Sequence, residues 1–205
     1  MKKYLLSCAA LLVAVQIWPL TVIIDPGHGG KDPGVRGICI QDGKECSLLE
    51  KDVVLHIAQK TAAVLAQRRP DIRVVLTRSD DSFIPFTERK QKIQVAAQGE
   101  KTLSISIHNN GTMNASVRGF EVGAQKNMTS FAQTLSTQLT TAIGKKMPFR
   151  KIFDFSESSL MTYTMTDITL DVGFLSNKED AALLADEGFI NEFSEALANG
   201  ILQYQ

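Results

Sequence analysis

The sequence predicts a single α/β domain built on one largely parallel sheet. The chain has 205 residues, of which 44% are hydrophobic, so it is long enough to bury one sizeable core. Short apolar runs rich in β-branched residues alternate with longer segments whose apolar residues recur every three or four positions. No internal repeat interrupts this order. Strands that alternate with helices favour a sheet covered by helices.

The first 18 residues are predicted as an export signal, or as an N-terminal anchor if they are not removed. Lys2 and Lys3 give the segment a positive start, and an apolar run follows from residue 5 to about residue 18. That run is shorter than the roughly 20 apolar residues of a transmembrane helix. The alternative is a first strand and helix of the fold. We assign the folded domain to residues 19–205 and expect an exported protein of the periplasm or cell envelope.

Five segments are expected as strands and five as helices. Each strand is a short apolar run bounded by Gly, Pro or polar residues, and each helix carries apolar residues at helical spacing. The strands are expected at residues 21–24, 72–76, 102–107, 120–122 and 167–170. The helices are expected at residues 47–68, 83–98, 129–146, 177–184 and 187–204.

Two cysteines, Cys39 and Cys46, remain once the leader is removed. They flank a short polar loop, and an even pair in an exported chain favours a disulfide. Two free, partly buried thiols are the alternative.

The charges of the chain balance, with 22 basic and 22 acidic side chains. This gives no long-range attraction to nucleic acid, so no nucleic-acid partner is expected. Contact with a membrane is expected only through an uncleaved leader, and we expect a monomer.

The loop after the first predicted strand carries a single histidine, His28. Pro and Gly residues on both sides of it exclude a helix or a strand. The loop therefore holds an imidazole at the C-terminal end of a core strand, where the ligand sites of open α/β sheets gather. A phosphate-binding loop is the alternative, but neither G-x-G-x-x-G nor G-K-[ST] is present.

Two more side chains are expected at the same edge of the sheet. Glu50 falls on the apolar face of its helix, in the first turn, and an inward carboxylate is costly unless it is paired or bound to a metal. His108 lies at the C-terminal end of the strand that begins at residue 102. Two imidazoles and one carboxylate form a three-ligand zinc set with an open fourth position.

Asp171 follows another apolar strand and precedes a glycine turn. A lone Asp at a strand end is usually a turn or capping residue. At this edge of the sheet, it is also a candidate for the general base of a hydrolysis.

Seven short segments, taken together, resemble the zinc-dependent N-acetylmuramoyl-L-alanine amidases. They run in order from about residue 21 to the C-terminus, and the first and last are the most specific. The segments are residues 24–34 (IDPGHGGKDPG), 50–52 (EKD), 76–78 (LTR), 88–89 (ER), 106–109 (SIHN), 119–121 (GFE) and 172–177 (VGFLSN).

The resemblance implies a six-stranded, largely parallel sheet with helices on both faces. It implies that an amidase-like catalytic domain, residues 19–205, binds one zinc ion through His28, Glu50 and His108. The implied reaction is hydrolysis of the amide between the lactyl group of N-acetylmuramic acid and L-alanine in peptidoglycan. Asp25 is then expected to orient a ligand histidine, and Asn109 or Asn110 to hydrogen-bond the substrate.

One residue departs from the family pattern, which has a catalytic Glu where this chain has Asp171. Asp is one methylene shorter, and a base displaced by ~1 Å can cost on the order of 100-fold in rate. The alternative function is therefore a weakly active or inactive homologue that binds peptidoglycan or a cell-wall partner. A zinc peptidase that cuts elsewhere in the stem is a further alternative, although the H-E-x-x-H motif is absent.

Overall fold

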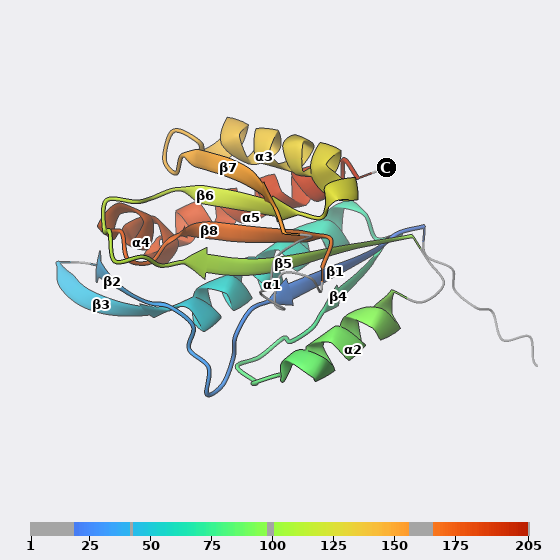
Figure 1. Cartoon of the computed structure of the whole chain (residues 1–205), viewed down its shortest axis with the longest axis horizontal. Coiled ribbons are helices and arrows are strands. Elements are labelled where there is room, and N and C mark those ends of the chain that lie inside the picture. The colour runs from blue at the N-terminus through green and yellow to red at the C-terminus, as the bar shows by residue number, and fades with distance from the viewer. Residues whose placement is uncertain (1–18, 42, 98–100, 156–165, 205) are drawn as a thin grey trace, which may run out of the picture.

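Six strands form the central sheet of the computed structural model, which describes residues 19–41, 43–97, 101–155 and 166–204 (Figure 1). The predicted leader lies outside these residues, so it remains a prediction. The strand order is β4-β1-β5-β8-β6-β7. The bounds are β1 Thr21–Pro26, β4 Arg73–Leu76, β5 Thr102–Asn110, β6 Phe120–Ala124, β7 Phe149–Asp154 and β8 Ile168–Phe174.

The sheet is largely parallel, as the sequence predicted. Strand β1 pairs in parallel with β4 and β5, β5 with β8, and β6 with β7. Only the β6–β8 pair is antiparallel among these. The carboxyl ends of β1, β5 and β8 consequently meet at one edge, and this is where the predicted site residues lie.

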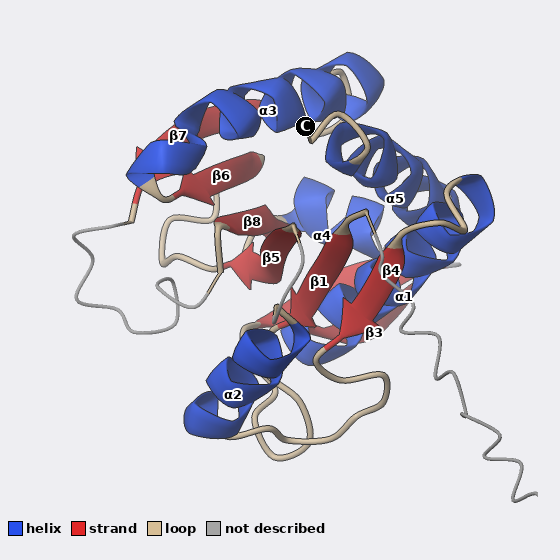
Figure 2. Cartoon of the chain, turned by 90° about the vertical axis from the view of Figure 1, so that its right-hand side faces the viewer, coloured by secondary structure: helices blue, strands red, loops and turns tan. Residues whose placement is uncertain are grey.

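Helices cover both faces of the sheet (Figure 2). Helix α2 packs on one face, and α1, α3 and α5 form the layer on the other. The helical bounds are α1 Glu50–Arg68, α2 Phe86–Ala96, α3 Thr129–Ile143, α4 Lys178–Ala185 and α5 Glu187–Ile201, with a short 3-10 turn, η1, at Lys126–Met128. Among the described residues, no helix is both long enough and apolar enough to cross a membrane.

The alternation of side chains along β1 divides the core between these two layers. Val22 and Ile24 join the large core beneath α1, α3 and α5. Ile23 points the other way and packs with Ile93 and Ala96 of α2. Because successive strand residues face opposite sides, Asp25 falls on the α2 side with Ile23.

Three described strands were absent from the prediction. Residues 36–49 form a hairpin of β2, Arg36–Gln41, and β3, Lys44–Leu49, in place of the expected loop and helix start. Helix α1 therefore begins at Glu50 rather than at residue 47. Strand β7 is an edge strand with two basic residues in succession, so it lacks the apolar run that marks the inner strands.

Candidate metal centre

Three side chains from separate elements converge at the carboxyl edge of the sheet. His28 lies in the loop after β1, Glu50 is the first residue of α1, and His108 lies in β5. His28 Nε2 and His108 Nδ1 each lie 3.0 Å from Glu50 Oε1. One ligand atom from each residue lies within 4.8 Å of the other two.

This donor set fits a zinc ion. Zinc bonds to histidine and carboxylate are about 2.0–2.2 Å long, so two donors at tetrahedral angles lie about 3.3–3.5 Å apart. The 3.0 Å separations from Glu50 are close to this spacing. The two imidazole rings meet nearly at right angles, with centroids 5.1 Å apart, so both present a nitrogen to the same point without stacking. Three protein ligands would leave a fourth position for substrate or water.

Glu50 is buried at 2% exposure and is held in the charged form. Burial by itself raises its pKa, but hydrogen bonds from His108 and His28, and their charge, outweigh burial and lower the pKa to about 2. The backbone N–H groups of Val35 and Asn109 donate to Oε2 and Oε1 over 2.8 and 2.9 Å. A metal ligand must be deprotonated, and these contacts satisfy that requirement.

His28 occupies a left-handed backbone conformation, with φ of 59°. This conformation is uncommon for a residue with a side chain, and contacts around the loop must hold it there. Its ring Nδ1 lies 2.9 Å from Asp32 Oδ2. Burial lowers the pKa of the imidazole, but hydrogen bonds and charge from Glu50 and Asp32 raise it by more. Asp32 therefore fixes the ring with Nε2 turned toward Glu50.

In the structure, the partners of Asp25 are residues other than the ligand histidines. Its carboxylate accepts from Arg89 over 2.6 Å, from Ser106 over 3.0 Å, and from the Thr77 hydroxyl. Asp25 thus anchors α2 to β1 beneath the site, and Asp32 is the residue that contacts a ligand histidine. Both oxygens of Asp25 are bonded to these partners, on the face of the sheet that packs against α2.

Two buried arginines bind the backbone of the His28 loop. Arg89 donates to the carbonyl oxygens of Pro26 and His28 over 2.7 and 2.9 Å. Arg78 donates to those of Pro26 and Gly27 over 3.0 and 2.7 Å. These bonds satisfy carbonyl groups at the end of β1 and in the loop that follows, and they stabilise the unusual conformation of His28.

Asp171 lies inside β8 rather than after it, paired in register with His108 of β5. It is 3% exposed. Burial raises its pKa to about 6, with the charges of Glu121 and Glu50 acting in the same direction and His108 opposing them. Glu121 of β6 is the cross-strand partner of Asp171. Arg150 Nε donates to Glu121 Oε1 over 2.7 Å.

The two candidate substrate-binding asparagines differ in the exposure of their side chains. Asn109 is buried, and its amide nitrogen donates to the carbonyl oxygen of Val172. Asn110 is half-buried, and its amide nitrogen lies 3.5 Å from Glu121 Oε2. Asn110 is the more accessible of the two.

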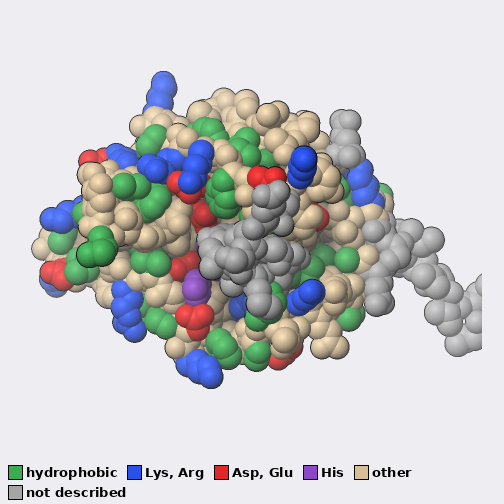
Figure 3. Space-filling view, in the orientation of Figure 1, with side chains coloured by type: hydrophobic (Ala, Val, Ile, Leu, Met, Phe, Trp, Pro, Cys, Tyr) green, Lys and Arg blue, Asp and Glu red, His purple; other side chains and the backbone are tan. Residues whose placement is uncertain are grey.

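Two hollows adjoin the histidines. The first, which we call the aromatic hollow, measures about 240 Å³ and is lined by Phe83, Ile84 and Phe86 together with His28 and His108. The second, the polar hollow, measures about 410 Å³, and its lining adds Asn110, Gly111 and Asp171 to the same two histidines. In Figure 3, a histidine surface lies between acidic side chains on the face shown.

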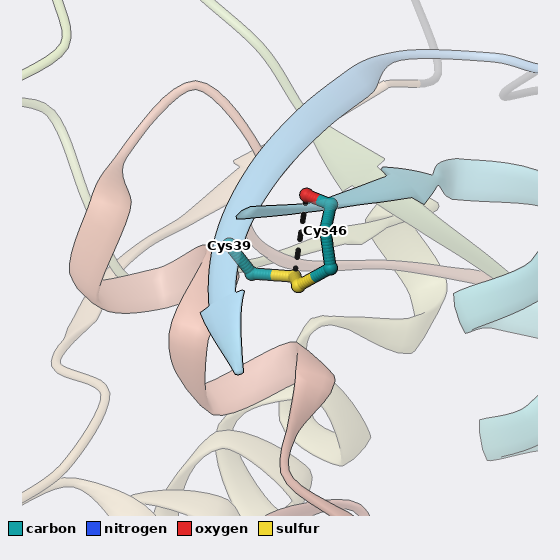
Figure 4. Close-up of a disulfide and its surroundings, with 2 residues drawn as sticks. All are labelled: Cys39 and Cys46. Atoms are coloured by element: carbon teal, nitrogen blue, oxygen red, sulfur yellow. Dashed lines mark hydrogen bonds between the residues drawn. A yellow bond between two sulfur atoms is a disulfide. The ribbon is translucent and has the colours of Figure 1, made fainter. Parts of the chain in front are cut away.

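The cysteine pair lies on the β2–β3 hairpin, where Cys39 and Cys46 are cross-strand partners. Their Cα atoms are 5.1 Å apart, within the range of a disulfide, and the structure joins their sulfur atoms (Figure 4). A hollow of about 510 Å³ beside β2 and α4 contains none of the metal-site residues.

Several residues at the site were not assigned a role from the sequence. Asp32, Arg78 and Arg89 stand in segments that match the family pattern, but nothing in their spacing shows which atoms they contact. Glu121 also stands in a matching segment, residues 119–121, but its position beside Asp171 depends on the pairing of β6 with β8.

Comparison with known proteins identifies the family of the chain. The profile of the family described as N-acetylmuramoyl-L-alanine amidase matches residues 22–203. The chain is 32% identical over 189 residues to the endolysin of Bacillus phage SPP1, covering 89% of this chain but only 65% of the endolysin. Among solved structures, the amidase AmiC2 of Nostoc punctiforme superposes with a TM-score of 0.77 and 33% identity, covering 92% of this chain and 98% of that one. The catalytic domain of CwlV from Bacillus (Paenibacillus) polymyxa var. colistinus gives 0.75 and 32%, covering 90% and 97%.

Proposed function

The chain belongs to the N-acetylmuramoyl-L-alanine amidase family, and from this premise we propose that it hydrolyses the amide between the lactyl group of N-acetylmuramic acid and L-alanine in peptidoglycan. The observation that carries the proposal is the convergence of His28, Glu50 and His108, with ring nitrogens 3.0 Å from a shared carboxylate oxygen. A fourth residue, Asp171, lines the polar hollow together with these three side chains.

The three converging side chains are proposed to hold one zinc ion. Zinc bound there would lower the pKa of a water molecule to about 7 and polarise the scissile carbonyl. Glu50 supplies a carboxylate that is already ionised, because its pKa is about 2. Asp32 keeps the Nε2 atom of His28 directed at the site by bonding Nδ1.

Asp171 is proposed as the general base and then the general acid. One of its carboxylate oxygens takes a proton from the attacking water and passes it to the nitrogen of the departing L-alanine. The carbon–oxygen bond forms, the carbon–nitrogen bond breaks, and the products are a lactyl carboxylate and a free amine. The pKa of about 6 belongs to the metal-free site, and a cation bound nearby would lower it and favour the carboxylate form that accepts the proton.

The shorter side chain of Asp171 favours one other function, that of a weakly active or inactive protein that binds peptidoglycan or a cell-wall partner. A zymogram on purified sacculi separates the two. An amidase clears the sacculi and releases stems with a free L-alanine N-terminus. A binding protein sediments with the sacculi and leaves them intact.

The direct test measures zinc content and muropeptide products together. We expect about one zinc per chain in the wild-type protein and loss of zinc in Glu50→Gln. Asp171→Asn should keep the zinc and lose most of the activity, whereas Asp171→Glu should keep the zinc and raise the activity if the native base is too short. Equal activity in the wild-type protein and Asp171→Asn would show that Asp171 is not the base.

Peptidoglycan lies outside the cytoplasm, so the proposed reaction requires export. The basic and apolar pattern of residues 1–18 supports a signal for that purpose. We propose a monomeric protein of the periplasm or cell envelope, attached to a membrane only if this leader is retained. N-terminal sequencing of the mature protein from cells decides whether the leader is cleaved.

A further inference from the structure

We propose that the aromatic hollow binds the muramyl side of the substrate and that the polar hollow binds its peptide stem. This inference rests on the amidase function proposed above. It specifies how the substrate lies across the metal centre, and therefore which surface recognises sugar and which recognises peptide.

Apart from the two shared histidines, different elements line the two hollows. The aromatic hollow is built from β1 and the loop after it, from the segment between β4 and α2, and from the start of α2. The polar hollow is built from β5 and β8, from Glu50 at the start of α1, and from residues 34–35. Because the strand order is β4-β1-β5-β8, the shared histidines lie between them.

The geometry of the scissile bond requires two diverging sites. A secondary amide is planar and strongly prefers the trans form, so the groups on its carbon and its nitrogen leave in opposite directions. The carbonyl carbon has to lie beside His28 and His108 to be attacked. One half of the substrate therefore enters each hollow.

The position of Asp171 sets the orientation. A residue that protonates the leaving amine has to come within about 2.6–3.2 Å of that nitrogen. Asp171 lines the polar hollow and not the aromatic hollow, whose two carboxylates, Asp25 and Asp32, are already bonded to Arg89 and His28. The nitrogen of L-alanine, and the stem that follows it, consequently lie in the polar hollow, where Asn110 and Gly111 offer polar groups to a peptide.

The aromatic hollow suits the remaining half, which is a sugar. At about 240 Å³, it has room for a compact ring rather than a long chain. Phe83 is 41% exposed although it is a large apolar residue, and Phe86 is half-buried beside it. The C–H faces of a pyranose pack against aromatic rings by burying apolar surface.

The aromatic hollow is held in shape by contacts between its two loops. Lys31 Nζ lies 4.6 Å from the centroid of the Phe83 ring. Lys51 donates to the Gly30 carbonyl over 3.0 Å and to Asp81 over 2.7 Å, and the Gly30 N–H donates to Asp81 over 2.8 Å. The ring of Phe83 is therefore positioned before substrate arrives, which reduces the ordering cost of binding.

The test measures the binding of each half of the substrate to the full-length, zinc-loaded protein. The probes are the peptide-free disaccharide that ends in N-acetylmuramic acid and the free tetrapeptide stem, each followed by calorimetric titration. Phe83→Ala removes the ring from the aromatic hollow. Val95→Ala, a matched truncation of a 58% exposed apolar residue on α2, is the control.

We expect Phe83→Ala to weaken the affinity for the disaccharide about tenfold, which is the size expected for most of one apolar ring contact. The affinity for the stem should not change, so the ratio of stem affinity to disaccharide affinity should rise by the same factor. Val95→Ala should leave that ratio at the wild-type value. Weaker stem binding in Phe83→Ala, equal loss for both probes, or a wild-type protein that does not bind the disaccharide would overturn the inference. A wild-type protein that fails to cleave peptidoglycan but shows the expected pattern would instead overturn the proposed function and support the inference.

Discussion

Gly27 is the residue whose substitution tests the metal centre most directly. A Cβ atom added there would lie 2.3, 2.6 and 2.8 Å from Cε1, Nδ1 and Nε2 of His108. Non-bonded carbon atoms prefer about 3.5–4.0 Å, so the His108 ring has to withdraw by roughly 1 Å. The backbone cannot yield instead, because the N–H and carbonyl of Gly27 are bonded to Ile107 and Arg78 over 3.0 and 2.7 Å.

We expect Gly27→Ala to lower zinc affinity about 10- to 100-fold and kcat/KM on peptidoglycan on the order of 100-fold. The affinity is measured by competition with a chelator of known strength, and the fold is checked by thermal unfolding. Gly188→Ala is the control, because its Cβ would meet only the Asp186 carboxylate, at 3.1 Å, at the exposed start of α5. Wild-type zinc affinity in Gly27→Ala would refute the assignment of His108 as a ligand.

Three further predictions follow from the described contacts. First, a general base works in its deprotonated form, and a cation beside Asp171 lowers its pKa from about 6. As the pH is lowered, kcat/KM should therefore fall tenfold per pH unit below a midpoint at or under about pH 6. A pH–rate profile that is flat to about pH 4 would contradict this. Second, Arg89→Leu leaves the buried Asp25 without its cation and should lower the free energy of unfolding, measured in urea, by about 3–5 kcal/mol. Lys92→Leu, which removes an exposed cation from the same helix, should lower it by less than about 1 kcal/mol. Equal stability of the two variants would refute the role of Arg89. The double variant Cys39→Ser, Cys46→Ser should lose about 2–3 kcal/mol, and reductant should destabilise only the wild-type protein; identical masses after alkylation with and without reductant would exclude the bridge.

Much of the site followed from periodicity in the sequence. Helical spacing placed Glu50 on the buried face of α1, and it lies there at 2% exposure. Strand alternation and strand ends placed His28 and His108 at one edge of the sheet, and their nitrogens converge there. These features depend on local geometry that repeats at a fixed interval, so they can be read before the fold is known.

The partners of the ligands could not be predicted in the same way. Asp25 and Asp32 flank His28 almost symmetrically in the sequence, and only the folded loop, in which His28 has a left-handed φ, shows that its ring contacts Asp32. The β2–β3 hairpin was also missed, because its outer residues, Ile38 and Ile40, remain exposed and give no sign of a buried face. Both features depend on tertiary contacts rather than on local pattern.

The location of the three proposed ligands in the loop after β1, on α1 and in β5 has a consequence for when the site forms. His28 and His108 lie at the ends of adjacent strands, but β2, β3, α1, β4 and α2 separate them in the sequence. His108 can meet Glu50 only after β5 has paired with β1, so an unfolded chain offers no cluster of all three ligands. The proposed zinc site is therefore a property of the assembled domain rather than of any one segment of the chain.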